Sequence, residues 1–323
     1  MLAFTKLCKG LVIRAISATT AAMTEISRCG YIALIGAPNA GKSTLLNRLV
    51  GQKVAIVTPK AQTTRSRVTG VTSEGSTQLI FLDVPGVFNA KQKFEAAMVA
   101  SAWQAGREAD VILYMHDAYK IPGEEAEQFV ERVKQSGKPI VLALNKIDAV
   151  DDKRLLLERM AWFNERAPWA HIFLISARKG DEVAELKSTL AGMLPEGPWL
   201  FDADAMTDMP MRLIASELTR EQCFLQLQQE LPYTLMVETE QYTPRADGSV
   251  EIHQNIIVQN ERQKGIVIGK GGSMLKSIGE KARGQIGYAI SGTCHLKLFV
   301  KVREDWKEKP DAYRYLGLEF TKQ

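Results

Sequence analysis

The chain has 323 residues, which is long enough for two domains. Hydrophobic residues make up 46% of the sequence and charged residues 24%, and the formal net charge is +4, values that are ordinary for a globular protein. The four cysteines are scattered and form no C-x-x-C pair, and the four histidines show no ligand spacing. These patterns argue against a disulfide-stapled scaffold and against a metal site built on histidine.

Residues 1–28 form an N-terminal extension ahead of the first predicted strand. Within it, residues 1–23 contain Lys6, Lys9 and Arg14 but no acidic residue. This pattern is typical of a targeting peptide or of a short surface-binding helix, and its apolar runs are too short to span a bilayer. The alternative that we favour is an over-long start, because Met23 comes shortly before the first strand.

A phosphate-binding loop follows the first strand, which is predicted at 31–35. Residues 36–43 fit the pattern G-x-x-x-x-G-K-[ST], and a helical pattern follows at 44–50. In such a loop, glycines let backbone N–H groups surround phosphate oxygens, and the helix N-terminus adds a favourable dipole. Lys42 can reach the β- and γ-phosphates, and the Ser43 hydroxyl can coordinate Mg²⁺. The predicted nucleotide-binding residues here are Gly36, Ala37, Pro38, Asn39, Ala40, Gly41, Lys42, Ser43 and Thr44.

Beyond this loop, strand-like and helix-like segments alternate. An antiparallel pair is predicted at 67–72 and 78–83, and short apolar runs typical of buried parallel strands come after it. These runs lie at 111–115, 139–144 and 172–175, and helices are predicted at 91–107, 123–136, 152–166 and 181–194. The alternation predicts an α/β fold with a doubly wound sheet, whose ligands bind beyond the carboxyl ends of the strands.

Two motifs stand at such carboxyl ends. The D-x-x-G motif at 83–86 brings the Asp83 carboxylate to Mg²⁺ through water and the Gly86 N–H to the γ-phosphate. The N-K-x-D motif at 145–148 supplies Asp148, which accepts from guanine N1–H and the 2-amino group, while Asn145 reaches the other edge of the base. Adenine offers no donor pair at that position, so a buried site of this kind rejects it.

A third motif, S-A-x-x-G at 176–180, follows the last predicted strand and supplies a backbone N–H for the guanine oxygen. Together with the phosphate-binding loop, the motifs come in the order of a GTPase domain. The predicted nucleotide-binding residues outside the loop are Asp83, Gly86, Asn145, Lys146, Asp148, Ser176, Ala177 and Arg178.

A second domain is predicted after a Pro/Gly break at 194–198 and a linker at 199–210. An amphipathic helix is expected at 211–230. Strands are then expected at 235–241, 250–258 and 296–302, and helices at 263–268 and from 275 onward. Between those last two helices lies the G-x-x-G sequence Gly269-Lys270-Gly271-Gly272. This order matches a type II KH domain, the prokaryotic type, in which the loop clamps about four nucleotides of single-stranded RNA.

Charge favours RNA as the ligand of this second domain. Residues 261–323 contain 13 Lys and Arg against 7 Asp and Glu, so the positive charge is concentrated in the half that carries the loop. A merely solvated basic surface is the alternative. Trp306, Tyr313 and Tyr315 could stack on bases, but packing of a terminal helix is the expectation that we favour.

The motifs together resemble GTPases of the Era type, from about residue 29 to the C-terminus. The resemblance rests on G-x-P-N-x-G-K-S-T, on Gln62-Thr63-Thr64-Arg65, and on D-x-P-G, N-K-x-D and S-A-x-x-G. It implies an Era-type G domain at 29–198, a linker at 199–210 and a KH type II domain at 211–323. It also implies that one of the paired threonines, taken as Thr64, closes on Mg²⁺ when the γ-phosphate is present; a solvated loop is the alternative.

The resemblance further implies a set of metal ligands and catalytic residues. The metal ligands would be Ser43, Thr64 and Asp83, and the catalytic residues Lys42, Thr64 and Gly86. Position 87 is Val, where Ras-like proteins carry the glutamine that orients water, so slow intrinsic turnover is expected. Position 84 is Val where Era proteins usually carry Thr, with little expected effect. Asn39 either helps hold a potassium ion or is a plain loop residue.

By this resemblance the chain would be a GTP-hydrolysing switch that uses GTP, GDP and Mg²⁺. It would bind the 3′ region of 16S ribosomal RNA during assembly of the 30S subunit. A cytoplasmic monomer is implied, with peripheral contact to the inner membrane as an option. One alternative is an RNA-binding protein in which nucleotide only stabilises the structure. Another is a tRNA-modification GTPase, for which no segment remains to supply the extra catalytic domain.

Overall fold

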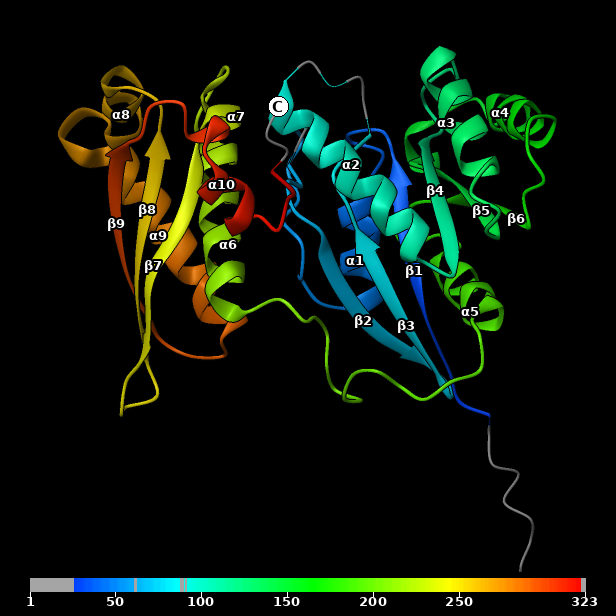
Figure 1. Ribbon diagram of the computed structural model, residues 1–323, viewed down its shortest axis with the longest axis horizontal. Helices are drawn as coiled ribbons and strands as arrows, with labels where there is room; N and C mark the ends of the chain where they lie inside the picture. Colours follow the sequence, from blue (N-terminus) through cyan, green and yellow to red (C-terminus); the bar gives the residue numbers. More distant parts are fainter. Residues whose placement is uncertain (1–25, 61–62, 88–89, 91, 321–323) are drawn as a thin grey trace, which may run out of the picture.

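The computed structural model describes residues 26–60, 63–87, 90 and 92–320. The expectations for residues 1–25 and for Gln62 therefore lie outside the described residues. Two domains lie side by side, and a long connecting segment joins them along one end (Figure 1). Within the part of the chain that the structure describes, no helix is both long and apolar enough to cross a bilayer.

The first domain is a three-layer α/β unit. Its strands are β1 (Arg28–Gly36), β2 (Val68–Glu74), β3 (Thr77–Asp83), β4 (Val111–Asp117), β5 (Ile140–Asn145) and β6 (His171–Ile175). Its helices are α1 (Lys42–Val50), α2 (Lys93–Glu108), α3 (Glu124–Lys134), α4 (Arg154–Asn164) and α5 (Val183–Met193), with a 3-10 turn η1 (Ile147–Ala149) after β5. The strand order is β2-β3-β1-β4-β5-β6, and only β2 runs antiparallel to its neighbour.

The sheet is covered on both faces, as predicted for parallel strands. Every residue of β3, β4 and β5 is buried, and this burial on both faces explains the continuous apolar runs that begin β4 and β5. One face packs against α2, α3 and α4, through residues such as Trp103, Phe129 and Phe163. The other face packs against α1 and α5, through residues such as Leu46 and Leu186. The predicted doubly wound architecture is confirmed.

The second domain has the type II KH topology. It contains α6 (Met211–Gln226), α7 (Leu231–Thr234), β7 (Met236–Pro244), β8 (Val250–Val258), α8 (Glu261–Ile268), η2 (Lys270–Gly272), α9 (Ser273–Ala289), β9 (Cys294–Val302), η3 (Trp306–Glu308) and α10 (Pro310–Tyr315). Strands β7 and β8 are antiparallel, and β9 lies parallel to β8. Helices α6 and α9 pack on the sheet, through residues such as Leu218, Ala282 and Ile286. The segment predicted as one helix at 211–230 ends earlier, at Gln226, and the short α7 follows it.

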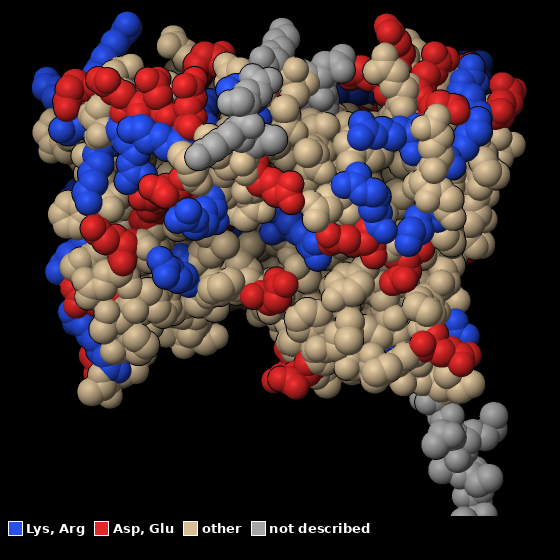
Figure 2. All heavy atoms as spheres, in the orientation of Figure 1, with Lys and Arg blue, Asp and Glu red and all other residues tan. Residues whose placement is uncertain are grey.

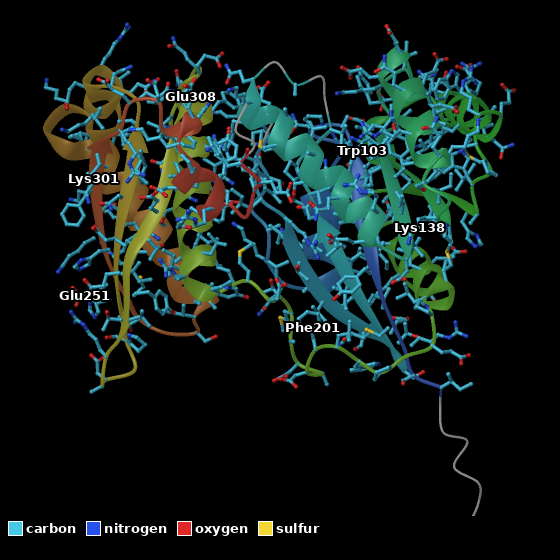
Figure 3. The ribbon with its side chains drawn as sticks, viewed as in Figure 1. Trp103, Lys138, Phe201, Glu251, Lys301 and Glu308 are labelled. Carbon is cyan, nitrogen blue, oxygen red and sulfur yellow. The ribbon has the colours of Figure 1, made fainter. Side chains whose placement is uncertain are left out.

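The predicted linker at 199–210 is attached to the first domain rather than free. The Gln78 side chain accepts from the Leu200 and Phe201 N–H groups at 2.9 and 3.0 Å and donates to the Phe201 carbonyl at 2.8 Å. The Val71 N–H donates to the Met206 carbonyl at 2.8 Å, on the edge strand β2. Figure 3 shows Phe201 at this end of the first sheet. These contacts hold the start of the second domain close to the first.

The C-terminal segment packs between the domains. Phe94 of α2 makes edge contacts with Trp306 and Tyr313, with ring centroids 5.7 and 5.5 Å apart. The Trp306 and Tyr313 rings are buried. The Tyr315 hydroxyl accepts a hydrogen bond of 3.1 Å from the Thr239 N–H. The expectation that these aromatic residues pack rather than stack on bases is confirmed. These aromatic residues pack in part against the first domain, a contact that the sequence pattern did not indicate.

Candidate nucleotide site and nucleic-acid loop

The phosphate-binding loop lies between the end of β1 and the start of α1. Gly41 has φ = 99°, and a Cβ atom there would lie 2.2 Å from Asn145 Nδ2, so both backbone conformation and space require glycine. The Lys42 ammonium turns back over the loop and donates to the Gly36 and Ala37 carbonyls, at 3.1 Å each. Its charge is therefore placed over the hollow that the loop encloses.

Lys42 and Asp83 are buried charges of opposite sign at this site. Burial lowers the pKa of Lys42 to about 8, and the nearby Asp83 carboxylate opposes that shift. Burial raises the pKa of Asp83 to about 6, against the attraction of Lys42 and the hydrogen bond from Ser43. Both groups lose solvation in the fold, so a bound anion at Lys42 and a bound cation at Asp83 would each restore favourable interactions.

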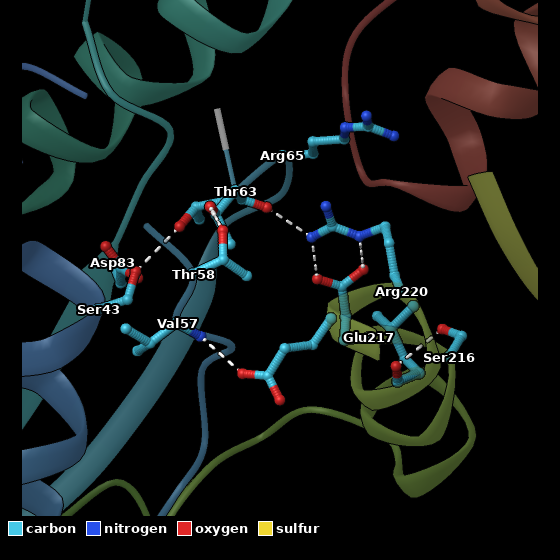
Figure 4. A network of polar contacts seen from close by, with 12 residues as sticks. Ser43, Val57, Thr58, Thr63, Arg65, Asp83, Ser216, Glu217 and Arg220 are labelled. Atoms are coloured by element: carbon cyan, nitrogen blue, oxygen red, sulfur yellow. Dashed lines mark hydrogen bonds and ion pairs between the residues drawn. The ribbon is translucent and has the colours of Figure 1, made fainter. Parts of the chain in front are cut away.

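Three side-chain oxygens converge where the predicted metal would bind. The Ser43 hydroxyl donates to Asp83 Oδ2 at 2.5 Å (Figure 4). The Ser43 oxygen also lies 2.9 Å from Thr64 Oγ1. Asp83 Oδ1 is buried and has no hydrogen-bond partner among the described residues. Hydroxyl and carboxylate oxygens are the ligands that Mg²⁺ prefers, and an unpaired buried carboxylate oxygen is best satisfied by a cation or its water. The residues present therefore fit Mg²⁺.

The two paired threonines have different surroundings. The Thr63 hydroxyl turns away from the loop, with Thr58 Oγ1 at 2.7 Å and the Lys60 carbonyl at 2.8 Å. Only the Thr64 hydroxyl reaches Ser43. The geometry thus places Thr64, the residue that the resemblance selects, beside the other two metal-ligand candidates.

The base-binding motifs meet at the carboxyl ends of β5 and β6. The Ser176 hydroxyl donates to Asp148 Oδ1 at 2.7 Å, and this hydrogen bond is the main cause that lowers the pKa of Asp148. The carboxylate is thus held ionised and oriented, as a guanine acceptor must be. Lys146, with φ = 68°, forms an ion pair with Asp117 at 2.7 Å.

Asn145 joins the base-binding and phosphate-binding parts of the site. Its Nδ2 donates to the Ala40 carbonyl at 2.8 Å, and its Oδ1 accepts from the Ala177 N–H at 2.9 Å. This side chain is predicted to lie at the edge of the base, and the structure shows that it also braces two loops. Arg48 of α1 supports the same loop from the other side, donating to the Ala177 carbonyl at 3.2 Å and to the Arg178 carbonyl. No local pattern marks Arg48, because its partners are about 130 residues away.

The D-x-x-G loop lies directly against the phosphate-binding loop. A Cβ atom on Gly86 would come within 2.6 Å of the Pro38 nitrogen, and the Val87 N–H donates to the Gly36 carbonyl at 3.1 Å. The Val84 side chain is fully buried in the core. Val87 also packs against that core. Val84 and Val87, the two positions at which the sequence departs from related motifs, are thus apolar residues with apolar neighbours.

Asn39 lies at the exposed tip of the phosphate-binding loop in a left-handed conformation, with φ = 63°. Its Nδ2 donates to the Pro59 carbonyl at 3.4 Å. The tip of the loop therefore contacts the segment that leads to Thr63 and Thr64.

The G-x-x-G loop joins α8 and α9 of the KH domain. Gly269 has φ = 73° and ψ = 174°, and a Cβ atom there would lie 2.8 Å from the Cβ of Met274, so only glycine fits. Lys270 and Gly271 are exposed at the tip, where nothing lies within 4 Å of a Cβ built on Gly271 or Gly272. The loop thus presents bare backbone and one ammonium group to solvent, as an RNA clamp requires.

Part of the positive charge counted in this domain is neutralised on its sheet. Lys297 pairs with Glu251 at 2.8 Å and Lys301 with Glu240 at 3.3 Å. Figure 3 shows Glu251 and Lys301 on the KH sheet, far from the first domain. Acidic and basic side chains are also interspersed over the face drawn in Figure 2. The excess charge of residues 261–323 is therefore a weaker argument for RNA than the loop itself.

Comparisons with known proteins agree with both domains. Residues 31–146 match the family described as 50S ribosome-binding GTPase, and residues 230–307 match the KH domain family. GTPase Era of Bradyrhizobium sp. strain BTAi1 is 46% identical over 297 residues, which cover 92% of this chain and 96% of the relative. GTPase Era of Brucella suis is 47% identical over 294 residues, covering 91% of this chain and 94% of the relative.

Solved structures extend the likeness to three dimensions. An Era variant from Aquifex aeolicus bound to GDP and AlF4⁻ is 39% identical, with a TM-score of 0.86, and the match covers 90% of this chain and 99% of that chain. A structure described as Era in complex with MgGDPNP and nucleotides 1506–1542 of 16S ribosomal RNA is 38% identical, with the same TM-score and coverage. The chain therefore belongs to the Era family of GTPases, in which a P-loop GTPase domain is followed by a KH domain.

Proposed function

We propose that this GTPase is a molecular switch that binds the 3′ region of 16S ribosomal RNA through its KH domain and acts in assembly and maturation of the 30S subunit. The observation that carries the proposal is the likeness to the Era complex with nucleotides 1506–1542 of 16S RNA, which covers 90% of this chain. The exposed loop at 269–272 supports it, because it offers the backbone access and charge that RNA phosphates need.

In the phosphate half of the site, we assign Ser43, Thr64 and Asp83 to Mg²⁺. When bound, the metal would neutralise charge on the β- and γ-phosphates. Lys42 and the Gly86 N–H are assigned to the γ-phosphate. The Lys42 ammonium is held over the loop by hydrogen bonds to the Gly36 and Ala37 carbonyls. The convergence of three ligand-type oxygens also argues against the alternative in which nucleotide is only structural.

In the base half, we assign Asp148 to guanine N1–H and the 2-amino group. Ser176 holds that carboxylate, and Asn145 holds the loop that follows it. The Ala177 N–H already donates to Asn145, so the donor that we assign to the guanine oxygen is the Arg178 N–H. Lys146 is kept in place beside the base by Asp117.

Slow intrinsic hydrolysis is part of the proposal. The Val87 side chain can neither donate nor accept a hydrogen bond, so it cannot orient the attacking water. A potassium ion near Asn39 would add positive charge to the transition state. Because Asn39 Nδ2 bonds to the Pro59 carbonyl, its side-chain oxygen is the atom that we assign to that ion. Monomeric state, cytoplasmic location and peripheral contact with the inner membrane stay predictions of the resemblance.

Crosslinking tests the proposed RNA target. The full chain, loaded with a GTP analogue or with GDP, is irradiated with total cellular RNA, and the crosslinked fragments are sequenced. The expected result is strong enrichment of the 16S 3′ region, which is lost when Lys270 and Gly271 are both replaced by Asp. Enrichment of another RNA, or enrichment that survives the loop substitution, would overturn the proposal.

A further inference from the structure

The residues on both sides of Thr64 are bonded to the KH domain. The Thr63 carbonyl accepts a hydrogen bond of 2.6 Å from Arg220 Nη2 of α6 (Figure 4). The Arg65 guanidinium donates to the carbonyls of Leu235, Pro232 and Tyr233, at 2.5, 3.1 and 3.0 Å, in and after α7. The backbone that carries the Thr64 hydroxyl is therefore held between two anchors in the other domain.

The two arginines that make these contacts are buried. Arg220 is only 1% exposed and Arg65 only 3%. Glu217 binds Arg220 in a fork, through Nε at 2.8 Å and through Nη2. The Phe224 ring lies 5.3 Å from the Arg220 guanidinium carbon and 5.6 Å from that of Arg65. A planar guanidinium with several fixed donors can hold a carbonyl in one geometry, which a flexible ammonium cannot do as well.

Further contacts extend this attachment toward the N-terminus of the same segment. The Val57 N–H donates to Glu221 Oε1 at 2.9 Å, and Lys53 pairs with the other oxygen of that carboxylate. The Lys60 ammonium donates to the Phe224 and Leu227 carbonyls at the C-terminal end of α6. Those carbonyls lack partners within the helix, so a cation is well placed there. We call residues 53–60 and 63–65 the clamped segment.

We infer that Arg65 and Arg220 are positioning residues for Thr64, so that the KH domain sets the geometry of the cation site in the GTPase domain. The inference rests on the proposed role of Thr64 as a metal ligand. Any ligand that moves α6 and α7 relative to the first domain would move Thr64 away from Ser43 and Asp83. By linkage, a cation bound at those three oxygens would stabilise this placement of the KH domain.

Hydrogen exchange tests the anchoring without nucleotide or metal. The bond from Arg220 to the Thr63 carbonyl is one of the contacts that hold the clamped segment against α6, and opening of that segment exposes the Val57 amide. In the nucleotide-free chain, Arg220→Gln should therefore favour opening and raise the exchange rate at the Val57 amide by about 10-fold or more, the usual effect of losing a hydrogen bond from a charged group. The matched control is Thr69→Val, which removes a hydrogen bond of 3.2 Å between β2 and Asp208 just ahead of α6. The control should leave the Val57 amide unchanged. Equal exchange in wild type and Arg220→Gln would overturn the inference.

A double-mutant cycle tests whether Arg220 acts through Thr64. In single-turnover hydrolysis, Arg220→Gln should slow the reaction by about 10-fold and raise the Mg²⁺ concentration needed for half-maximal rate. GDP affinity should change less than about 2-fold, because the base-binding loops are untouched. When Thr64 is already Ala, adding Arg220→Gln should have no further effect on the rate. An undiminished effect in that background would mean that Arg220 acts by another route.

Two further variants test the same inference independently of Arg220→Gln. Arg65→Lys keeps the charge but loses the fork, so it should reproduce the Arg220→Gln phenotype; wild-type kinetics in this variant would count against the inference. If Arg220→Gln does not fold, Glu217→Gln, which only loosens Arg220, should give the same direction of change with a smaller size. A Thr64→Ala variant that hydrolyses GTP normally would instead defeat the proposed role of Thr64. These two failures are therefore distinguishable.

Discussion

The hydroxyl oxygens of Thr64 and Ser43 lie 2.9 Å apart, although the two residues are 21 positions apart in the chain. Ser43 belongs to α1, whose position is set by packing against the first sheet. Thr64 belongs to the clamped segment, whose position is set by α6 and α7 of the KH domain. The Ser43–Thr64 pair therefore connects the nucleotide site to the KH domain. It is the place where nucleotide binding and RNA binding can influence each other.

Base selection should depend on Asp148. Asp148→Asn places an amide donor where guanine also donates, so GTP and GDP should bind more weakly and xanthine nucleotides should be favoured. The change in preference should be large, because the NH₂ group of the variant would face the guanine 2-amino group as one donor against another, whereas xanthine offers a carbonyl oxygen there. Competition between GDP and XDP for a fluorescent nucleotide measures it, and a variant that still prefers GDP would remove the assignment of Asp148.

Asn145→Ala should separate affinity from base selection. The substitution leaves the buried Ala40 carbonyl and Ala177 N–H without their partner, which should weaken GDP binding by about 30-fold or more. The hydrogen bond between Asp148 and Ser176 stays, so the preference for GDP over XDP should persist. Titrations with both nucleotides measure the two effects. Unchanged GDP affinity would show that the bracing contacts contribute little.

Asp83 should make the stability of the nucleotide-free chain depend on pH. Its pKa rises from 3.8 to about 6 in the fold, so the protonated form is favoured by folding. The stability linked to that proton is fully present below about pH 4 and is lost as the pH rises through about 6. Asp83→Asn stays neutral throughout, so at pH 7.5 it should be more stable than wild type by about 1–3 kcal/mol. Thermal unfolding without Mg²⁺ should show a smaller gain at pH 5, and an equal gain at both pH values would contradict the assignment.

Hydrolysis should respond to the monovalent cation. If the Asn39 side-chain oxygen holds potassium, single-turnover hydrolysis should be faster in potassium than in sodium at matched ionic strength. Asn39→Ala should remove the difference. Equal wild-type rates in the two salts would eliminate the potassium site and leave the rest of the nucleotide site as assigned.

The motif residues and most of the elements could be predicted from sequence, for physical reasons. Continuous apolar runs mark β4 and β5 because those strands are buried on both faces, and β8 was predicted with its observed bounds, Val250–Val258. The phosphate-binding loop and its Lys42 follow from spacing alone, since glycine is required where backbone must surround phosphate. The helices predicted at 91–107 and 181–194 are observed at Lys93–Glu108 and Val183–Met193, so their ends differ by only one or two residues.

The contacts between the domains could not be predicted in this way. Helix α6 was expected to have one apolar face, yet the charged residues Arg220 and Glu221, which contact the first domain, are buried as well. Periodicity detects the face that packs on the helix's own sheet, whereas a second face that packs on another domain is polar and resembles a solvated surface. The contacts of Arg65 could not be predicted either, because its carbonyl partners are about 170 residues away. Backbone carbonyl groups are present at every residue, so they leave no pattern of side chains in the sequence.

The most direct test of the central claim is RNA binding by the full chain in its two nucleotide states. The probe is a fluorescent RNA with the sequence of the last part of 16S RNA, titrated with wild type and with the Lys270→Asp, Gly271→Asp double variant. We expect the wild type to bind with a salt slope near −0.7 per phosphate neutralised.

The wild type should also bind this RNA with different affinities in the GTP-analogue and GDP states, and RNA should reciprocally change the affinity for the GTP analogue. The double variant should keep its fold, because the loop tip is exposed, and should lose binding by about 100-fold or more, since two carboxylates replace the phosphate contacts. A folded double variant that binds like wild type would contradict the role of the loop. Equal RNA affinities in the two nucleotide states would contradict the switch.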